Sequence, residues 1–253
     1  DIDWYTYLHT TPKRMTRAMD GLMFTEDERQ EYQQAGTWSE LFAPESWSNR
    51  LPLLVWFVAL QIIGWLVVPL GFVVFRNLYD RGYILAKAVG LLLTGWGIWL
   101  LASWHVLRFS QASIVLVIML VALLSALVLG THYRELVLFV KHRWRFLLLE
   151  EGLFWLMFGI ALFIRWQNPD LWTPFQEDEK MMDFAYLNAV VKTPFFPPYD
   201  PWFAGGYLNY PYFGLLLIAL LVKLTGIVPA IAYNLALPTF FALTATAAWS
   251  VGF

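Results

Sequence analysis

Residues 51–75 have the sequence LPLLVWFVALQIIGWLVVPLGFVVF, and this stretch contains no charged side chain. A helix needs about 20 consecutive apolar residues to cross the hydrocarbon core of a bilayer. The stretch is long enough for such a crossing. We therefore expect it to form a membrane-spanning helix.

Similar apolar stretches follow it along the chain. Hydrophobic residues make up 59% of the sequence and charged residues only 14%, which is typical of an integral membrane protein. The sequence predicts an all-α, polytopic membrane protein with about six transmembrane helices. We expect them at residues 51–75, 82–104, 112–131, 146–165, 212–224 with flanking residues, and 228–253.

Lysines and arginines indicate the orientation, because cytoplasmic loops carry an excess of them. They follow the first and third spans and end the fifth: Arg76, Arg81, Arg134, Lys141, Arg143, Arg145 and Lys223. If six spans cross the membrane, all these positions share one side. This places the N-terminal segment and the long loop 166–211 on the opposite, non-cytoplasmic side.

Charge and composition exclude several classes of function. The formal net charge of −2 provides no basic field for nucleic acid, so we expect no nucleic-acid partner. The chain has no cysteine, which excludes disulfides and thiolate chemistry. Its histidines, His9, His105, His132 and His142, include no pair at the helical spacing of metal ligands.

Three ionisable residues fall near the ends of the apolar stretches: Lys87, Glu150 and Glu151. An ion-coupled transporter would need such groups along a path in the middle of the membrane. Lys87 lies about one turn from the start of its span, so it can extend its amine to the interface. We expect interfacial or helix-pairing roles for all three residues rather than an ion path.

The N-terminal segment differs from the rest in being polar. Thr11-Pro12 starts a short predicted helix that Gly21 ends, and Thr25 with Glu28 forms a capping box before a second. We interpret residues 1–50 as a non-cytoplasmic cap or linker, 51–145 as a three-span region, and 146–253 as the start of a second module. Because the chain begins with Asp1 and ends inside an apolar run, we expect a piece of a longer polypeptide.

The loop 166–211 is rich in acids and carries the predicted chemistry. Its acids at 177–179 precede apolar residues at helical spacing, which predicts a helix lying on the membrane surface: Met182, Ala185, Tyr186, Ala189 and Val190. Glu179 and Asp183 are four residues apart and share a face, with Lys180 beside them. Such carboxylates could bind a divalent cation or accept a proton. The alternative is a solvated acidic helix start.

Residues 194–213, PFFPPYDPWFAGGYLNYPYF, surround a single acid, Asp200, with aromatic side chains. The prolines and Gly205-Gly206 impose an irregular, rigid path on the backbone. The aromatic residues alone fit an interfacial belt. A carboxylate gains nothing from the lipid interface, so we expect Asp200 to belong to a site.

These residues also carry a resemblance to a known family. The strings RWQNPDL, EKMMDFAYLNAVVKTPFFPPYDPWFAGGYLNYPYFG, TGIVPAIAYNLALPTFFALTA and LYDRGYILAKAVGLLL resemble the bacterial and archaeal YYY membrane proteins, over roughly residue 51 to the end. The organisation of that family is similar to the GT-C glycosyltransferases, which use lipid-linked sugars. In those enzymes an acidic motif in the first large outer loop binds metal or acts as a general base.

The resemblance implies roles for particular residues of this chain. Glu179 and Asp183 would form the acidic catalytic motif, with Asp178 as a further candidate, and Asp200 would be a second catalytic acid. Asp183 and Asp200 would hold any divalent metal, Mg²⁺ or Mn²⁺. The residues lining the substrate site would be Lys180, Asn188, Tyr207, Asn209, Tyr210 and Tyr212. Pro211 interrupts the tyrosine run that is typical of the family.

The implied activity is transfer of a sugar from a polyprenyl-phosphate donor to an acceptor at the outer face of a bacterial or archaeal cell membrane. Its expected partners are the lipid bilayer, the lipid-linked sugar and further protein subunits. A second hypothesis is a non-catalytic membrane subunit or scaffold, for which the 14 tryptophans would supply helix and lipid contacts. A third is a transporter of lipid-linked sugar.

Overall fold

The computed structural model describes residues 45–171, 179–203 and 205–252, together with Thr25, Asp27, Gln30 and Ala43. Its helices are α5 (Trp47–Arg50), α6 (Pro52–Val74), α7 (Ala86–Ser103), α8 (Gln111–Gln167), α9 (Lys180–Lys192), α10 (Phe213–Thr225) and α11 (Pro229–Gly252). Four of them, α6, α7, α8 and α11, are long and apolar enough to cross a membrane. The predicted α-helical membrane fold is confirmed. The helices expected near the N-terminus lie almost wholly outside the described residues.

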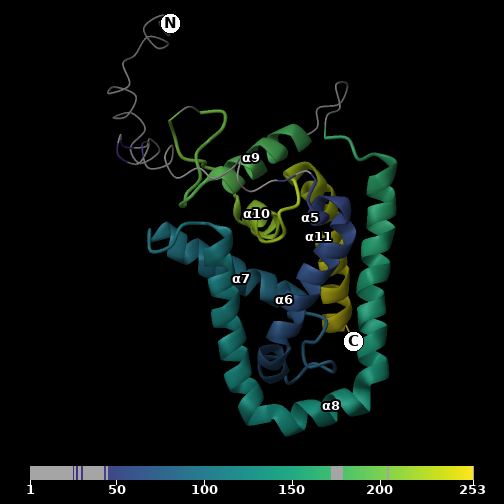
Figure 1. Ribbon diagram of the computed structural model, residues 1–253. Helices are drawn as coiled ribbons and strands as arrows, with labels where there is room; N and C mark the ends of the chain where they lie inside the picture. Colours follow the sequence, from purple (N-terminus) through teal and green to yellow (C-terminus); the bar gives the residue numbers. More distant parts are fainter. Residues whose placement is uncertain are drawn as a thin grey trace, which may run out of the picture.

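Helix α6 runs through the centre of the bundle and packs against α7 and α8 (Figure 1). It begins at Pro52, whose fixed φ suits the first helical position. A Cβ on Gly90 of α7 would lie 2.7 Å from the Ile63 carbonyl oxygen of α6, so glycine is required for this close approach. At the buried contact with α11, the Trp56 indole donates to the Thr239 hydroxyl at 2.9 Å. By length and apolar composition, α6, α7 and α11 agree with the spans predicted at 51–75, 82–104 and 228–253.

Helix α8 contains both the third and the fourth predicted span in 57 continuous residues. At about 1.5 Å per residue it would be ~85 Å long if straight, far more than the hydrocarbon core. Figure 1 shows instead a U, with two arms joined by a stretch across one end of the molecule. In this region the Thr131 hydroxyl donates to the Val128 carbonyl at 2.8 Å. Such side-chain bonds to the helix backbone favour bending.

The fifth predicted span is wrong, because α10 has both ends on the same side of the bundle. At its start the Trp99 indole, near the end of α7, donates to the Tyr212 hydroxyl at 3.0 Å. At its end the Lys223 amine donates to the Phe109 carbonyl, just before α8. Asn49, before α6, donates to the Gly226 carbonyl at 3.1 Å. Lys223 therefore lies away from the α8 bend, and α11 runs from α10 toward that bend.

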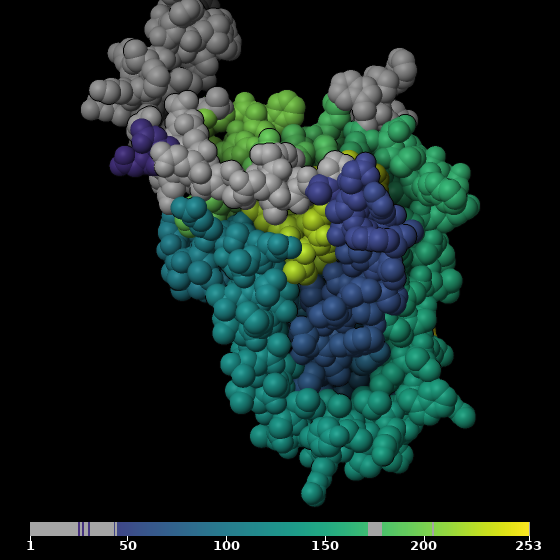
Figure 2. Space-filling model, in the orientation of Figure 1, coloured from purple at the N-terminus to yellow at the C-terminus, as the bar shows by residue number. Residues whose placement is uncertain are grey.

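The two ends of the bundle consequently carry different elements. Figure 2 shows α9 and the adjoining loop at one end and the bent middle of α8 at the other. The short turn between α6 and α7 lies at the α8 end, where Ser250 near the end of α11 donates to Asp80 at 3.5 Å. We call these the loop face and the arginine face; the arginine face carries Arg76, Arg81, Arg134, Lys141, Arg143 and Arg145.

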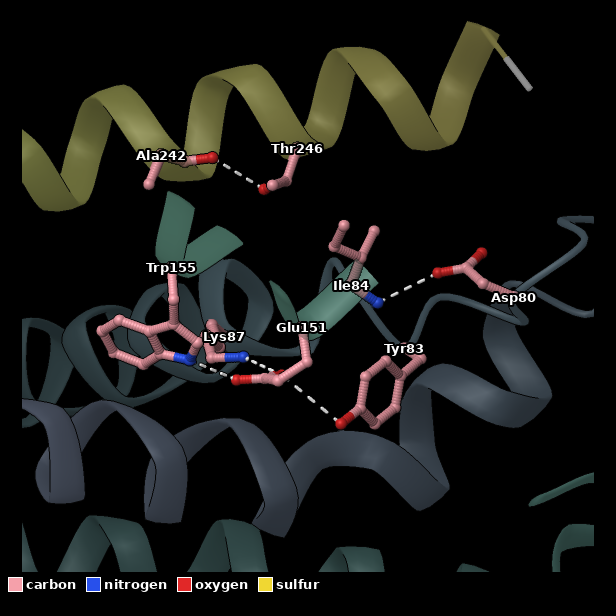
Figure 3. A network of polar contacts seen from close by, with 8 residues as sticks. All are labelled: Asp80, Tyr83, Ile84, Lys87, Glu151, Trp155, Ala242 and Thr246. Carbon is pink, nitrogen blue, oxygen red and sulfur yellow. Dashed lines mark hydrogen bonds and ion pairs between the residues drawn. The ribbon is translucent and has the colours of Figure 1, made fainter. Parts of the chain in front are cut away.

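A buried ion pair joins α7 to the second arm of α8. The Lys87 amine lies 2.7 Å from Glu151 Oε2, with the two side chains 6% and 17% exposed. Trp155 also donates to Glu151 Oε1, and Tyr83 donates to Oε2 at 3.4 Å (Figure 3). A helix-pairing role is thus confirmed for Lys87 and Glu151. The expectation that Lys87 extends to the interface is wrong, because its amine is buried among these partners.

We predict that Lys87→Met strongly destabilises the fold. The substitution leaves the buried Glu151 carboxylate without a cation, which typically costs about 3–5 kcal/mol. Thermal unfolding in detergent micelles measures the loss. Arg50→Gln is the matched control, because it breaks a surface pair with Glu45 whose side chains are 58% and 90% exposed and which contributes little. Equal shifts in the two variants would contradict a structural role for the buried pair.

Candidate functional site

Helix α9 forms the part of the loop that carries the predicted acids. It begins after the exposed Glu179, and Asp183 lies in its first turn, where a negative charge favours the helix dipole. Its buried residues, Leu187, Ala189, Val190 and Val191, face the bundle, and α10 is its main packing partner. The helix predicted after these acids therefore exists, and its packing against α10 supports the turn that carries Asp183.

The chain after α9 folds back as a tight loop over the bundle. The Phe109 amide donates to the Pro194 carbonyl at 2.6 Å, which ties the loop to the start of α8. Within the loop, the Leu208 amide donates to the Pro198 carbonyl at 2.8 Å, and the Asp200 amide to the Gly206 carbonyl at 2.9 Å. Gly205 has a φ of +80°, which glycine adopts easily. The irregular backbone path predicted here is confirmed.

Asp200 stabilises the turn of this loop. Its Oδ1 accepts hydrogen bonds from the backbone amides of Trp202 at 2.8 Å and Phe203 at 3.1 Å. Carboxylates commonly bond their own backbone two residues on in this way. The sequence analysis missed this structural role, although aspartate before a proline is a turn signal.

Tyr186 is the residue around which the candidate acids gather. Its ring lies 5.0 Å from the ring of Tyr210, measured between centroids. Loss of solvent around the hydroxyl raises the pKa of Tyr186, and the nearby Asp200, Tyr210 and Asp183 raise it further. The negative charges of Asp183 on α9 and Asp200 in the loop thus both contribute to this rise in pKa. We refer to Asp183, Tyr186, Asp200 and Tyr210 as the Tyr186 cluster.

The sequence analysis treated Tyr186 only as part of an apolar helix face. Its spacing could have indicated a place in the site, because a residue three positions after Asp183 lies on the same side of a helix. Its ring contact with Tyr210 depends on the loop folding back onto α9.

The other predicted site residues have different surroundings. The Tyr212 hydroxyl accepts from Trp99, and its ring stacks on Phe196 at 5.7 Å with an interplanar angle of 9°, so it is part of the packing. Tyr207 pairs with Tyr199 in an isolated antiparallel bridge. Glu179 and Asn209 are exposed, whereas Lys180 and Asn188 are half-buried on α9. Asp178 lies outside the described residues.

The carboxylates brought together are too few to define a metal centre by themselves. Among residues 45–171, 179–203 and 205–252, no group of three His, Asp or Glu side chains is arranged to hold an ion. A Mg²⁺ or Mn²⁺ ion at Asp183 and Asp200 would need water or substrate oxygens to complete its coordination.

A second feature of the loop face is an apolar groove of about 530 Å³ between α6, α8 and α11. Arg165 lies at this groove, and its Nε donates to Asn234 Oδ1 at 2.5 Å. Its other nitrogens donate to the backbone carbonyls of Asn168 at 3.0 Å and Asp170 at 3.4 Å. In the described part of the chain, no carboxylate forms an ion pair with this guanidinium.

The groove adjoins the elements that carry the Tyr186 cluster. Phe184 of α9 contacts Tyr233 of α11 with a centroid distance of 6.1 Å, and Tyr233 precedes Asn234, the partner of Arg165. The sequence analysis did not select Arg165. Its position in the sequence could have indicated it, because Arg165 is the last residue of the fourth apolar run, next to the acid-rich loop.

Comparison with known proteins identifies the family. Residues 93–253 match the family described as uncharacterized membrane protein (DUF2298). The chain belongs to this family. The matched segment contains α8 to α11, the Tyr186 cluster and Arg165, and the resemblance to YYY membrane proteins is consistent with it. No curated protein and no solved structure matches the chain.

We predict that Asp200→Ala destabilises the loop more than Asp200→Asn does. Alanine removes both side-chain bonds to the turn, at about 1 kcal/mol each, whereas the asparagine Oδ1 can still accept them. Limited proteolysis of the loop and thermal unfolding in detergent measure the difference. If both variants behaved alike, the two bonds to Oδ1 would not be holding the turn.

Proposed function

We propose that this family member transfers a sugar from a polyprenyl-phosphate donor to an acceptor hydroxyl at the loop face of the membrane. The observation that carries the proposal is the packing of the loop onto α9, where the Tyr210 ring contacts Tyr186 and where Asp183 and Asp200 both raise the Tyr186 pKa. The resemblance to GT-C enzymes, which place a catalytic acid on the first large outer loop, supports the same residues.

Asp183 is the general base in this proposal. It would take the proton of the acceptor hydroxyl while the acceptor oxygen bonds to the anomeric carbon. The bond between that carbon and the phosphate oxygen breaks, and the phosphate leaves with the electron pair. Asp200 has a structural task instead, because its Oδ1 accepts two backbone hydrogen bonds of the turn. Glu179, exposed one turn before Asp183, would be an alternative base.

Asp200 then shapes the acceptor site through the turn and through Tyr210. The remaining residues of the predicted site, Lys180, Asn188, Tyr207 and Asn209, lie on the same helix and loop. A divalent cation at Asp183 and Asp200 would neutralise the leaving phosphate.

The groove beside Arg165 supports a lipid-linked donor. Its lining is largely apolar, with Leu162, Phe163 and Leu235 among the residues that could contact a polyprenyl chain. A guanidinium with donors still available suits a phosphate. Such a chain would lie in the bilayer with its phosphate at the loop face.

The loop face would be the non-cytoplasmic one. The six arginines and lysines of the arginine face support this orientation, since cytoplasmic connections are rich in them. The resemblance suggests a bacterial or archaeal cell membrane.

A second candidate function is that of a non-catalytic subunit in a larger assembly. The observation favouring it is the exposure of α8. Only 17% of its most apolar stretch is buried, compared with 44% of the corresponding stretches of α6, α7 and α11. Helices of a partner could cover the arms of α8 through the same packing that joins transmembrane helices elsewhere.

We predict that Asp183→Asn lowers sugar transfer by at least about 100-fold, the usual contribution of a general base. The assay measures transfer from a radiolabelled polyprenyl-phosphate sugar by the purified protein in membranes. The matched control is Asp170→Asn, an exposed acid near the start of the same loop, which should keep wild-type activity.

Full activity of the Asp183→Asn variant would exclude Asp183 as the base. Assays with and without EDTA decide whether a metal takes part. Absence of transfer by a correctly folded wild-type protein that co-purifies with other subunits would favour the non-catalytic role.

A further inference from the structure

We infer that the arginine face holds a phospholipid with an amine headgroup, of the phosphatidylethanolamine class, in a built site between the α6–α7 turn and the middle of α8. Two neighbouring cavities carry this inference, one apolar and one polar. The site lies at the opposite end of the bundle from the Tyr186 cluster, so the inference does not depend on sugar transfer.

The first cavity, of about 290 Å³, is suited to an acyl chain. Its walls are mostly apolar, with Val68 and Phe72 from α6 and Phe139, Val140 and Leu147 from α8. The second cavity, of about 430 Å³, is lined by the polar residues Arg76, Asn77, Arg81, His132 and Glu135. Phe72 and Arg81 line both cavities. A molecule with an apolar chain and a charged head therefore fits across the two.

Arg81 is held at the junction of the cavities by its backbone and by aromatic rings. Its φ is +50°, a conformation that residues other than glycine seldom adopt. Its guanidinium carbon lies 4.4 Å from the centre of the Phe72 ring and 5.8 Å from that of Phe139. These contacts hold the guanidinium over the rings through its face, while its N–H donors point outward in the guanidinium plane, where a phosphate can accept from them.

The preceding residue, Asp80, anchors the turn rather than neutralising Arg81. Its side chain is buried and accepts from the backbone amide of Gly82 at 3.1 Å. It also accepts from the backbone amide of Ile84 at 2.9 Å, as Figure 3 shows. The Ser250 hydroxyl of α11 donates to the same carboxylate at 3.5 Å. Asp80 thus holds the turn against α11, and this position keeps Arg81 over the rings.

The charges of the polar cavity select the headgroup. Arg76 and Arg81 can hold a phosphate, and Glu135 can accept hydrogen bonds from an ammonium group. In the part of the chain that the structure describes, neither arginine forms an ion pair with Glu135. A headgroup carrying both a phosphate and a protonated amine complements all three charges. A purely anionic headgroup would leave Glu135 unmatched, and choline has no N–H to donate.

Native mass spectrometry of the purified full chain, with phosphatidylethanolamine, phosphatidylglycerol or phosphatidylcholine added in detergent, tests the inference. The wild type is expected to bind one phosphatidylethanolamine about tenfold more tightly than either other lipid, the usual effect of one charge-assisted hydrogen bond. Glu135→Gln should abolish this preference. Arg81→Gln should weaken binding of all three lipids by about tenfold.

The control for Arg81→Gln is Arg145→Gln, which also removes a positive charge from the arginine face but at a residue of α8 that lines neither cavity. It should bind lipid as the wild type does. Val140→Trp, at a position 38% exposed, fills the apolar cavity from the surface and should lower retention even if Arg81→Gln fails to fold. Unchanged binding in Val140→Trp, or an unchanged lipid preference in Glu135→Gln, would overturn the inference.

Discussion

The buried pair between Lys87 and Glu151 is the interaction on which the arrangement of the bundle depends. An unpaired charge at this depth is costly in a low-dielectric interior, so the two helices that carry the pair must stay together. Glu151 also accepts from Tyr83 and Trp155, which satisfies both of its oxygens. Gly64 of α6 makes room for this contact, because a Cβ there would lie 2.8 Å from Lys87 Cγ. The pair requires the second arm of α8 to return toward α7, which a straight helix could not do.

The sequence predicts most of the helices, because a bilayer allows few structures for a long apolar run. Helix α6, at Pro52–Val74, differs by one residue at each end from the predicted span 51–75. The continuity of α8 was not predictable from hydropathy. The basic stretch around Lys141 resembles a loop in polarity, yet lysine, arginine and leucine are good helix formers and the helix continues through it. Hydropathy also could not place α10, since its position depends on Asn49, Phe109 and other residues distant in sequence.

The candidate site likewise has features that neighbouring residues predict and features that depend on contacts between residues distant in sequence. Asp183 follows from helical spacing, and the rigidity of the loop around Asp200 follows from its prolines and glycines. What the sequence could not supply is the meeting of the two at Tyr186, because that depends on how the loop packs over α9. For the same reason Tyr212 was selected with Tyr210, although one packs against Trp99 and the other against Tyr186. Adjacent residues in a rigid loop can face different environments.

Three cations of the bundle, Lys87, Arg165 and Arg81, show two different physical arrangements. Lys87 is neutralised by a carboxylate at 2.7 Å and has only a structural task. Arg165 and Arg81 are held differently, the first by an amide and backbone carbonyls and the second by aromatic rings. These partners orient a guanidinium without cancelling its charge. Both arginines also border apolar cavities, one at each face of the bundle. A fixed, uncancelled positive charge beside an apolar cavity is complementary to an amphiphile with a phosphate, so the same physical argument leads to a lipid at both ends of the molecule.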